Sequence, residues 1–194
     1  TTYRLVNAEG DGIPGLVIDW YNGTAVIQCH SKAMNAEKEK FVEILKQGYG
    51  ERLKAVYDKS AKTLPFKSDV DSEDGYLFGG DSEKEVLEYG LKFKVHWETG
   101  QKTGFFIDQR ENRLMVQKYA KNRDVLNMFC YTGGFSFYAM KGGAGLVHSV
   151  DASASAIELT DRNVELNFPG DSRHESFMAD GFEFMRDIQG KYDL

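Results

Sequence analysis

The residues best suited to chemistry follow short apolar segments in the second half of the chain. Paired glycines, Gly133 and Gly134, come soon after the apolar segment 125–129, and an aspartate ends each of the next two apolar segments, Asp151 and Asp180. A strand that turns through glycines into a helix gathers free backbone N–H groups at a helix N-terminus. Such a turn suits the anionic or polar part of a cofactor, so we expect a nucleotide-type cofactor there.

Three kinds of nucleotide site compete at this turn. A P-loop would need Gly-x-x-x-x-Gly-Lys-Thr, whereas Gly100-Gln-Lys-Thr has an extra residue between glycine and lysine. A dinucleotide fold needs a third glycine where Phe137 stands, to allow close helix–strand packing around a pyrophosphate. An S-adenosylmethionine site needs glycines for the amino-acid end, a carboxylate for the ribose and a polar group for the adenine. The glycine turn, Asp151 and Asp180 supply these three in order.

A helix N-cap is the alternative explanation for each aspartate taken alone. The separation between Gly134 and Asp151 is close to the ~20 residues expected between a glycine turn and a ribose-binding acid. The two aspartates in register with the turn therefore favour the cofactor.

The elements that would position these residues alternate between strand and helix. The expected strands are 125–129, 146–150 and 175–179, the expected helices are 135–141, 153–166 and 181–188, and 192–194 would begin a fourth strand. This order predicts a parallel sheet with right-handed crossovers. A further helix would run from its cap, Asp108, to about Ala120, and its packed face would hold Leu114, Met115 and Tyr119.

The first half of the chain predicts a small α+β unit. Asn22-Gly23 between apolar runs indicates a hairpin over 15–29, and Lys54–Asp58 has the composition of a strand. Between them we expect a helix that Asn35 caps and that runs to about Lys46. Its packed face would consist of Phe41, Ile44 and Leu45.

Charge is unevenly distributed along the chain. Residues 68–88 hold eight acidic residues and one lysine, which predicts a mobile surface excursion, and a second hairpin would follow around Gly90. Residues 92–123 hold eight basic and three acidic residues, against a net charge of −6 for the whole chain. This segment suits a phosphate-contacting face, with ordinary solvated charges as the alternative.

Composition narrows the class of protein. The 194 residues are 41% hydrophobic, enough for a packed core, and no apolar run approaches the ~20 residues of a membrane span. Only two cysteines occur, far apart, and the histidines are scattered, so we expect a reducing cytoplasm and no metal.

Two segments carry a specific resemblance. Gly100-Gln-Lys-Thr-Gly-Phe-Phe-Ile-Asp-Gln-Arg-Glu-Asn-Arg113 and Val125-Leu-Asn-Met-Phe-Cys-Tyr-Thr-Gly-Gly-Phe-Ser136 resemble the RlmI-type bacterial 23S rRNA (cytosine-C5) methyltransferases, and Arg4–Asp19 is similar to the entry to that family's central domain. The resemblance implies S-adenosyl-L-methionine as methyl donor and carbon-5 of a ribosomal RNA cytosine as acceptor. Related guanine-N7 methyltransferases share the same stretches, so that acceptor stays an alternative.

The implied fold class is α/β. A small α+β central domain over 1–97 would precede an incomplete Rossmann-like class I methyltransferase parallel sheet over 98–194. By the resemblance, these residues would bind the cofactor: Gln101, Thr103, Phe106, Asp108, Arg110, Asn127, Phe129, Tyr131, Thr132, Gly133, Gly134, Asp151, Ala179 and Asp180. Ribosomal RNA would be the partner, with a homodimer as one open assembly state.

Parts of the family's pattern are missing from the chain. Its N-terminal PUA domain would precede Arg4, and its Asp-Pro-Pro motif and nucleophilic cysteine would follow Leu194. Cys29 and Cys130 are poor candidates for a thiolate that adds to carbon-6 of cytosine. We therefore expect a fragment without its catalytic half, inactive by itself. The alternatives are a non-catalytic RNA-binding module of the same fold and, disfavoured by the missing third glycine, an NAD-dependent oxidoreductase.

Overall fold

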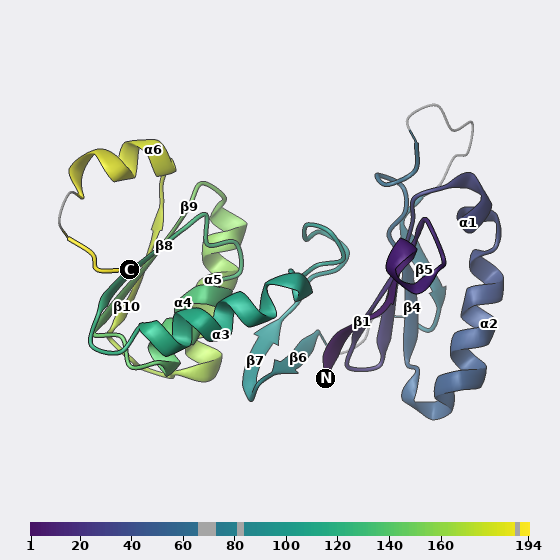
Figure 1. The fold of residues 1–194 in the computed structure, drawn as a ribbon, viewed down its shortest axis with the longest axis horizontal. Coiled ribbons are helices and arrows are strands. Elements are labelled where there is room, and N and C mark those ends of the chain that lie inside the picture. Colours follow the sequence, from purple (N-terminus) through teal and green to yellow (C-terminus); the bar gives the residue numbers. More distant parts are fainter. Residues whose placement is uncertain (66–72, 81–83, 189–190) are drawn as a thin grey trace. The chain divides into compact units, whose positions relative to one another are not determined.

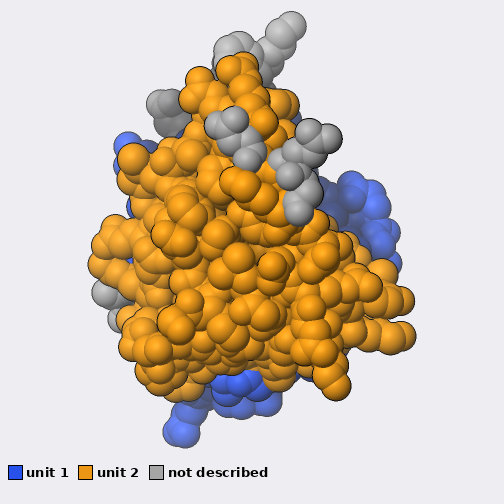
Figure 2. All heavy atoms as spheres, turned by 90° about the vertical axis from the view of Figure 1, so that its left-hand side faces the viewer, with its two compact units in different colours: residues 1–90, 95–107 blue, residues 91–94, 108–194 orange. Residues whose placement is uncertain are grey.

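The computed structural model describes residues 1–65, 73–80, 84–188 and 191–194 (Figure 1). The chain forms two compact units, unit 1 (residues 1–90 and 95–107) and unit 2 (residues 91–94 and 108–194), which Figure 2 colours separately. The expected division into domains at 97/98 stays a prediction. Among the described residues, no helix combines the length and the hydropathy that crossing a membrane requires.

Unit 1 is built on a five-stranded sheet with the order β1-β2-β3-β4-β5. Its strands are β1 (Thr2–Asn7), β2 (Leu16–Tyr21), β3 (Thr24–Cys29), β4 (Ala55–Asp58) and β5 (Gly75–Phe78). The hairpin predicted over 15–29 is confirmed, because β2 and β3 pair antiparallel through a turn in which Asn22 and Gly23 have φ of 47° and 106°. The predicted strand at 54–58 is also confirmed, and it pairs parallel to β3.

The connection between β3 and β4 contains two helices, α1 (Lys32–Ala36) and α2 (Lys38–Tyr49), and not the single helix expected. Ser31 caps α1 by accepting a hydrogen bond from the backbone N–H of Met34, so the prediction that Asn35 is the cap was wrong. Asn35 lies buried inside α1.

The packed face of α2 also differs from the prediction. Val42 and Leu45 are buried and Phe41 packs against the core, but Ile44 is 62% exposed. The face of α2 that packs against the sheet therefore includes fewer of the helix's apolar residues than the sequence predicted.

Part of the acidic run over 68–88 forms regular strands. Residues 66–72 and 81–83 lie outside the described residues, so its expected mobility is not assessed there. Gly75–Phe78, however, forms β5 and pairs antiparallel with β4, which overturns the expectation for that stretch. The hairpin predicted around Gly90 is confirmed by β6 (Glu85–Glu88) and β7 (Leu91–Lys94).

Unit 2 contains a parallel sheet with the order β10-β9-β8. Its elements are β8 (Asp124–Met128), α4 (Gly134–Lys141), β9 (Leu146–Asp151), α5 (Ala154–Asn167), β10 (His174–Met178) and α6 (Gly181–Phe184). The predicted strand–helix alternation is thus confirmed. At the other edge of β8, the N–H of Leu194 donates to the carbonyl of Asp124 and that of Leu126 donates to the carbonyl of Leu194. This pattern is that of a parallel strand beginning beside β8 (Figure 1).

Two helices of unit 2 differ from their predicted form. The helix α3 (Arg110–Tyr119) follows a 3₁₀ turn over Ile107–Gln109, and its N-cap is Gln109, so Asp108 is not its cap. On α3 the predicted face is wrong for Met115 and Tyr119, which are 56% and 50% exposed. The helix expected over 181–188 is the single turn α6, continued as a 3₁₀ turn over Met185–Asp187. The remaining 3₁₀ turns are Ala8–Asp11 and Gly50–Arg52.

The glycine at the end of β5 allows a close approach of two chain segments, which gives a stability prediction. Gly79 has φ of 69°, and a Cβ there would lie 2.2 Å from the carbonyl oxygen of Lys54. Gly79→Ala should therefore lower the free energy of unfolding of unit 1 by about 2–3 kcal/mol, measured by chemical denaturation.

Gly48 provides the matched control in the same unit. It lies inside α2, and a Cβ there would meet no atom within 4 Å. Gly48→Ala should leave the protein unchanged or stabilise it by up to about 1 kcal/mol. Equal effects of the two substitutions would contradict the steric explanation.

Candidate cofactor-binding site

The loop between β8 and α4 has a strained backbone. Phe129 and Tyr131 have φ of 56° and 49°, and Gly133 has φ of 75°. A residue other than glycine in such a conformation costs on the order of 1–3 kcal/mol, and this strain persists only where the surroundings enforce it. Strain of this kind concentrates at ligand-binding loops, so the loop over 129–134 is the first candidate for a binding site.

Two side chains of the helix α5 donate hydrogen bonds to backbone carbonyl groups of this loop. Thr160 Oγ1 donates to the carbonyl oxygen of Tyr131 at 3.0 Å, and Asn163 Nδ2 donates to that of Thr132 at 3.1 Å. Thr160 and Asn163 are both fully buried. A Cβ on Gly133 would lie 2.6 Å from Thr160 Cγ2, so only glycine permits this close approach between the loop and the helix.

Asp151 holds the same loop by an N–H group. Its Oδ2 accepts a hydrogen bond from the backbone N–H of Tyr131 at 3.0 Å, and its Oδ1 accepts one from the N–H of Ser153 at 2.9 Å. The N-cap of α5 is Ser153, so Asp151 is not the helix cap that was its alternative explanation. A carboxylate has about four lone-pair positions, so two stay available for a ligand's hydroxyl groups.

Asp180 and Ala179 follow β10 at the same edge of the sheet. Asp180 is the N-cap of α6 and accepts hydrogen bonds from the N–H groups of Phe182 and Glu183, so the capping explanation holds for this aspartate. Ala179 donates its N–H to the carbonyl oxygen of Asp151. A Cβ on Gly181 would lie 3.0 Å from the ring of Phe129, so the loop over 129–134 also packs against the start of α6. The structure thus brings the ends of β8, β9 and β10 together.

The N-terminus of α4 faces this loop without a side-chain cap. Its N-cap is Gly133, and no side chain among the described residues accepts a hydrogen bond there. Beside it lies Arg113, which is 2% exposed and has its guanidinium over the ring of Phe93, and its Cδ would be 3.2 Å from a Cβ on Gly134.

Sequence reasoning counted Arg113 among the surface charges of the basic segment 92–123. This arginine is buried and therefore belongs neither to a phosphate-contacting face nor to a solvated surface, while the role of the other basic residues stays a prediction.

Beneath the loop, Asn127 joins a buried polar group that the sequence did not reveal. Asn127 Nδ2 donates to Ser136 Oγ at 2.8 Å, Ser136 Oγ lies 2.6 Å from Ser149 Oγ, and Ser149 Oγ lies 2.8 Å from His174 Nε2. Ser136 and Ser149 have no exposed surface.

The remaining predicted residues precede β8, the first strand of the parallel sheet, in the sequence. Gln101, Thr103 and Phe106 belong to unit 1, whereas Asp108 and Arg110 stand at the 3₁₀ turn and at the start of α3 in unit 2. Gln101 and Asp108 are exposed, and Phe106 is half-buried with Lys102 Nζ 4.4 Å from the centre of its ring.

The hydroxyl of Thr103 has partners within unit 1. Thr103 Oγ1 donates to Asp19 Oδ2 at 2.5 Å and lies 2.7 Å from the hydroxyl of Tyr21. Lys59 Nζ contacts the carbonyl oxygens of Trp97 and Gly100 in the same segment. The segment over 97–106 is therefore anchored to the sheet of unit 1 by side-chain hydrogen bonds.

Neither cysteine has the environment of a nucleophile. Burial raises the pKa of the Cys130 thiol to about 11, although its contact with Thr160 acts in the opposite direction. Burial also raises the pKa of Cys29, which is fully buried in the core of unit 1. A thiolate is rare at either position near neutral pH.

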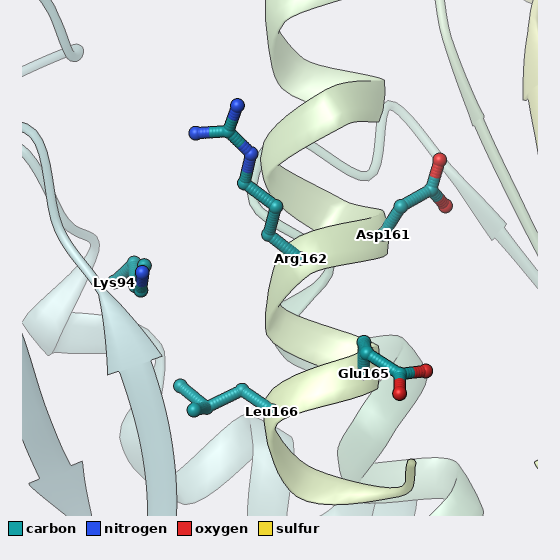
Figure 3. Close-up of a pocket in the computed structure, with 5 residues that line it drawn as sticks. All are labelled: Lys94, Asp161, Arg162, Glu165 and Leu166. Atoms are coloured by element: carbon teal, nitrogen blue, oxygen red, sulfur yellow. The ribbon is translucent and has the colours of Figure 1, made fainter. Parts of the chain in front are cut away.

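A separate hollow of about 600 Å³ lies along the outer side of α5, and none of the predicted site residues lines it. Figure 3 shows Arg162 and Leu166 projecting from α5 toward the side on which Lys94 lies, while Asp161 and Glu165 project from the opposite side of the helix. Its charges are mixed, two acidic and two basic, and they do not define a ligand.

A parallel sheet whose carboxyl ends hold a strained glycine turn and an acceptor such as Asp151 suits a nucleotide-type cofactor. A family model described as S-adenosylmethionine-dependent methyltransferase matches residues 4–192. The chain belongs to this family. Within this family, curated relatives that the chain matches are ribosomal RNA large subunit methyltransferases I.

The relatives support this assignment. The ribosomal RNA large subunit methyltransferase I of Pseudoalteromonas atlantica is 40% identical over 193 residues, which are 98% of this chain and 48% of the relative. A Streptococcus mutans structure, provisionally assigned as a SAM-dependent methyltransferase, has 28% identity and a TM-score of 0.85 over 100% of this chain and 50% of its own. The structure of SMU.776 complexed with SAH gives the same values. The chain spans about half the length of the curated relatives it matches.

The contact between Gly133 and Thr160 gives a testable prediction. Gly170 has nearly the same φ, 70°, but a Cβ there would meet nothing within 4 Å. Gly133→Ala should lower the free energy of unfolding of unit 2 by about 1–3 kcal/mol more than Gly170→Ala, because only Gly133→Ala adds the clash. Urea denaturation of both variants measures the difference.

Combining Gly133→Ala with Thr160→Ser should recover part of that loss. The serine lacks the Cγ2 that a Cβ on residue 133 would meet, and it keeps the hydroxyl that donates to Tyr131. If the double variant recovers no stability, the loss in Gly133→Ala does not come from the contact with Thr160 Cγ2.

The raised pKa of Cys130 predicts slow alkylation. In the native protein, modification by iodoacetamide should be slow near neutral pH and should accelerate by about tenfold per pH unit toward the thiol pKa, because the thiolate is the reacting form. Mass spectrometry of Cys130 and Cys29 peptides follows it, with the denatured protein as the fast control. Rapid native modification with a plateau near neutral pH would show an activated thiol.

Proposed function

We propose that this chain is the central and cofactor-binding part of an S-adenosylmethionine-dependent methyltransferase that acts on large-subunit ribosomal RNA, with carbon-5 of a cytosine as the acceptor. The observation that carries the proposal is the strained loop over 129–134, which Asp151 and α5 hold at the end of a parallel sheet. Family membership and the ribosomal RNA methyltransferase relatives support the reaction and the substrate class. We assign the sheet to an incomplete Rossmann-like class I fold, because its order, β10-β9-β8, agrees with half of a doubly wound sheet.

The residues present fit the cofactor. Side chains at Gly133 and Gly134 would fill the space beside the N-terminus of α4, and the absence of a side-chain cap leaves N–H groups of that helix for a carboxylate. Phe129, Tyr131 and Thr132 would border the amino-acid end, Asp151 would accept from the ribose hydroxyls, and Ala179 and Asp180 would border the adenine.

The bound cofactor supplies an electrophilic methyl group. The chain's own residues bind and orient it, and the strained loop is held in place before the cofactor arrives, which lowers the entropic cost of binding. Asp108 and Arg110, which belong to the same unit as the glycine loop, would border the site. We assign no catalytic nucleophile within residues 1–194, because both thiols are buried and have raised pKa values.

Calorimetry with S-adenosylhomocysteine on the full-length protein that contains this chain tests the cofactor assignment. Asp151→Asn should weaken binding by about 10-fold to 100-fold, because a charged acceptor for two ribose hydroxyls is worth about 1.5–3 kcal/mol. Glu158→Gln should bind like the wild type, because Glu158 is exposed on α5 and pairs only with Arg162 among the described residues. Binding that is absent in the wild type, or equal in both variants, would refute the assignment.

Methyl transfer to ribosomal RNA tests the reaction. The full-length protein should transfer labelled methyl from S-adenosylmethionine to undermethylated large-subunit RNA, and nuclease digestion should release 5-methylcytidine. Recovery of 7-methylguanosine would overturn the acceptor and keep the cofactor, and no transfer with intact cofactor binding would favour a non-catalytic RNA-binding role.

A further inference from the structure

A chain of four hydrogen-bonded side chains crosses the sheet of unit 2 beneath the glycine loop. It begins at Asn127 on β8, passes through Ser136 on α4 and Ser149 on β9, and ends at His174 on β10. Asn127 and Ser149 are register partners on neighbouring strands. The two serines have no exposed surface, so water does not interrupt the chain.

The bond from Asn127 suggests a direction for the protons in the rest of this chain. Asn127 Nδ2 is a donor only, so Ser136 Oγ accepts from it and uses its single proton toward Ser149 Oγ. If Ser149 continues this direction, it donates to Nε2 of His174, which then accepts as a neutral imidazole with its proton on Nδ1.

Adding a proton to Nε2 of His174 would reverse every bond. Ser149 would accept from the imidazolium and donate to Ser136, and Ser136 would need a new acceptor. Asn127 can supply one only if its amide turns over and directs Oδ1 toward Ser136. A buried hydroxyl without a partner is unfavourable, which favours the reversed chain over a broken one.

We propose that His174 is a positioning residue for the cofactor: through Ser149 and Ser136 it sets which end of the Asn127 amide is free at the end of β8. This inference rests on the proposed function, in which the amino-acid end of the cofactor lies at that point. The ammonium group of the cofactor requires an acceptor, which is Oδ1 of Asn127 when His174 is neutral. The protonated imidazole leaves the Nδ2 donor instead, and the cofactor binds more weakly.

The surroundings of His174 keep it neutral under ordinary conditions. Burial lowers the pKa of its imidazole, and that is the largest influence. The charged and titratable groups around it are Asp161 on α5, His148 on β9, and Asp171 and Glu175 beside it in the chain. The carboxylates raise the pKa and His148 lowers it, yet the net shift is downward. The affinity for the cofactor should therefore be highest above the pKa of His174, and it should fall as the pH drops through that pKa and the imidazole becomes protonated.

Nuclear magnetic resonance of residues 1–194 tests the chain without a ligand. The nitrogen shifts of His174 should report the Nδ1–H form at neutral pH, and the side-chain amide signals of Asn127 should titrate with the same midpoint as His174. In Ser149→Ala, His174 should still titrate while the Asn127 amide no longer follows it. A neutral Nε2–H form, or an Asn127 amide that ignores His174 in the wild type, would overturn the proposal.

Calorimetry with S-adenosylhomocysteine on the full-length protein provides the second test. The dissociation constant of the wild type should rise by up to about tenfold per pH unit below the His174 pKa. This dependence should disappear in His174→Gln and in Ser149→Ala, and it should persist in the matched control His148→Gln. His148 bonds to Tyr192 and not to the serines. The same pH dependence in all variants would overturn the proposal, whereas no binding by any of them would overturn the proposed function and leave the resonance test to decide.

Discussion

The hydrogen bonds that hold the loop over 129–134 from two sides are the interaction on which the site depends. Asp151 accepts from the N–H of Tyr131, while Thr160 and Asn163 on α5 donate to the carbonyls of Tyr131 and Thr132. Left-handed conformations at Phe129 and Tyr131 are unfavourable by themselves and persist because these bonds enforce them. The strand β9 and the helix α5 are therefore as much part of the site as the loop itself.

The two aspartates that follow neighbouring strands have different roles. Asp180 uses its carboxylate to cap α6, as many aspartates in that position do. Asp151 leaves the capping of α5 to Ser153 and binds the glycine loop instead. The same residue type after a strand thus has two outcomes, and the difference is a serine placed two residues later. The ribose-binding role proposed for Asp151 therefore does not compete with the capping of α5.

The segment over 97–106 combines a family resemblance with a structural role. Thr103 completes a buried group in which Asp19 also pairs with Arg4, and Lys59 holds the carbonyls of Trp97 and Gly100. Burial lowers the pKa of Lys59, because removal from water disfavours the charged ammonium form. The residues of this segment that resemble the family therefore anchor the segment to the sheet of unit 1, whatever contact they make with the cofactor.

The sequence by itself determined the order of strands and helices in unit 2, the hairpin at Asn22-Gly23 and the glycine turn after β8. Those features follow from apolar period and turn chemistry, which act between residues a few positions apart. Only the tertiary structure decided that Ile44, Met115 and Tyr119 face solvent, because their exposure depends on which side of a helix meets the sheet. It also decided that Arg113 is buried at the glycine turn and that Asn127 is joined to His174 through two serines. These contacts link residues distant in sequence, and polar side chains pair in a core only after the fold has removed water from them.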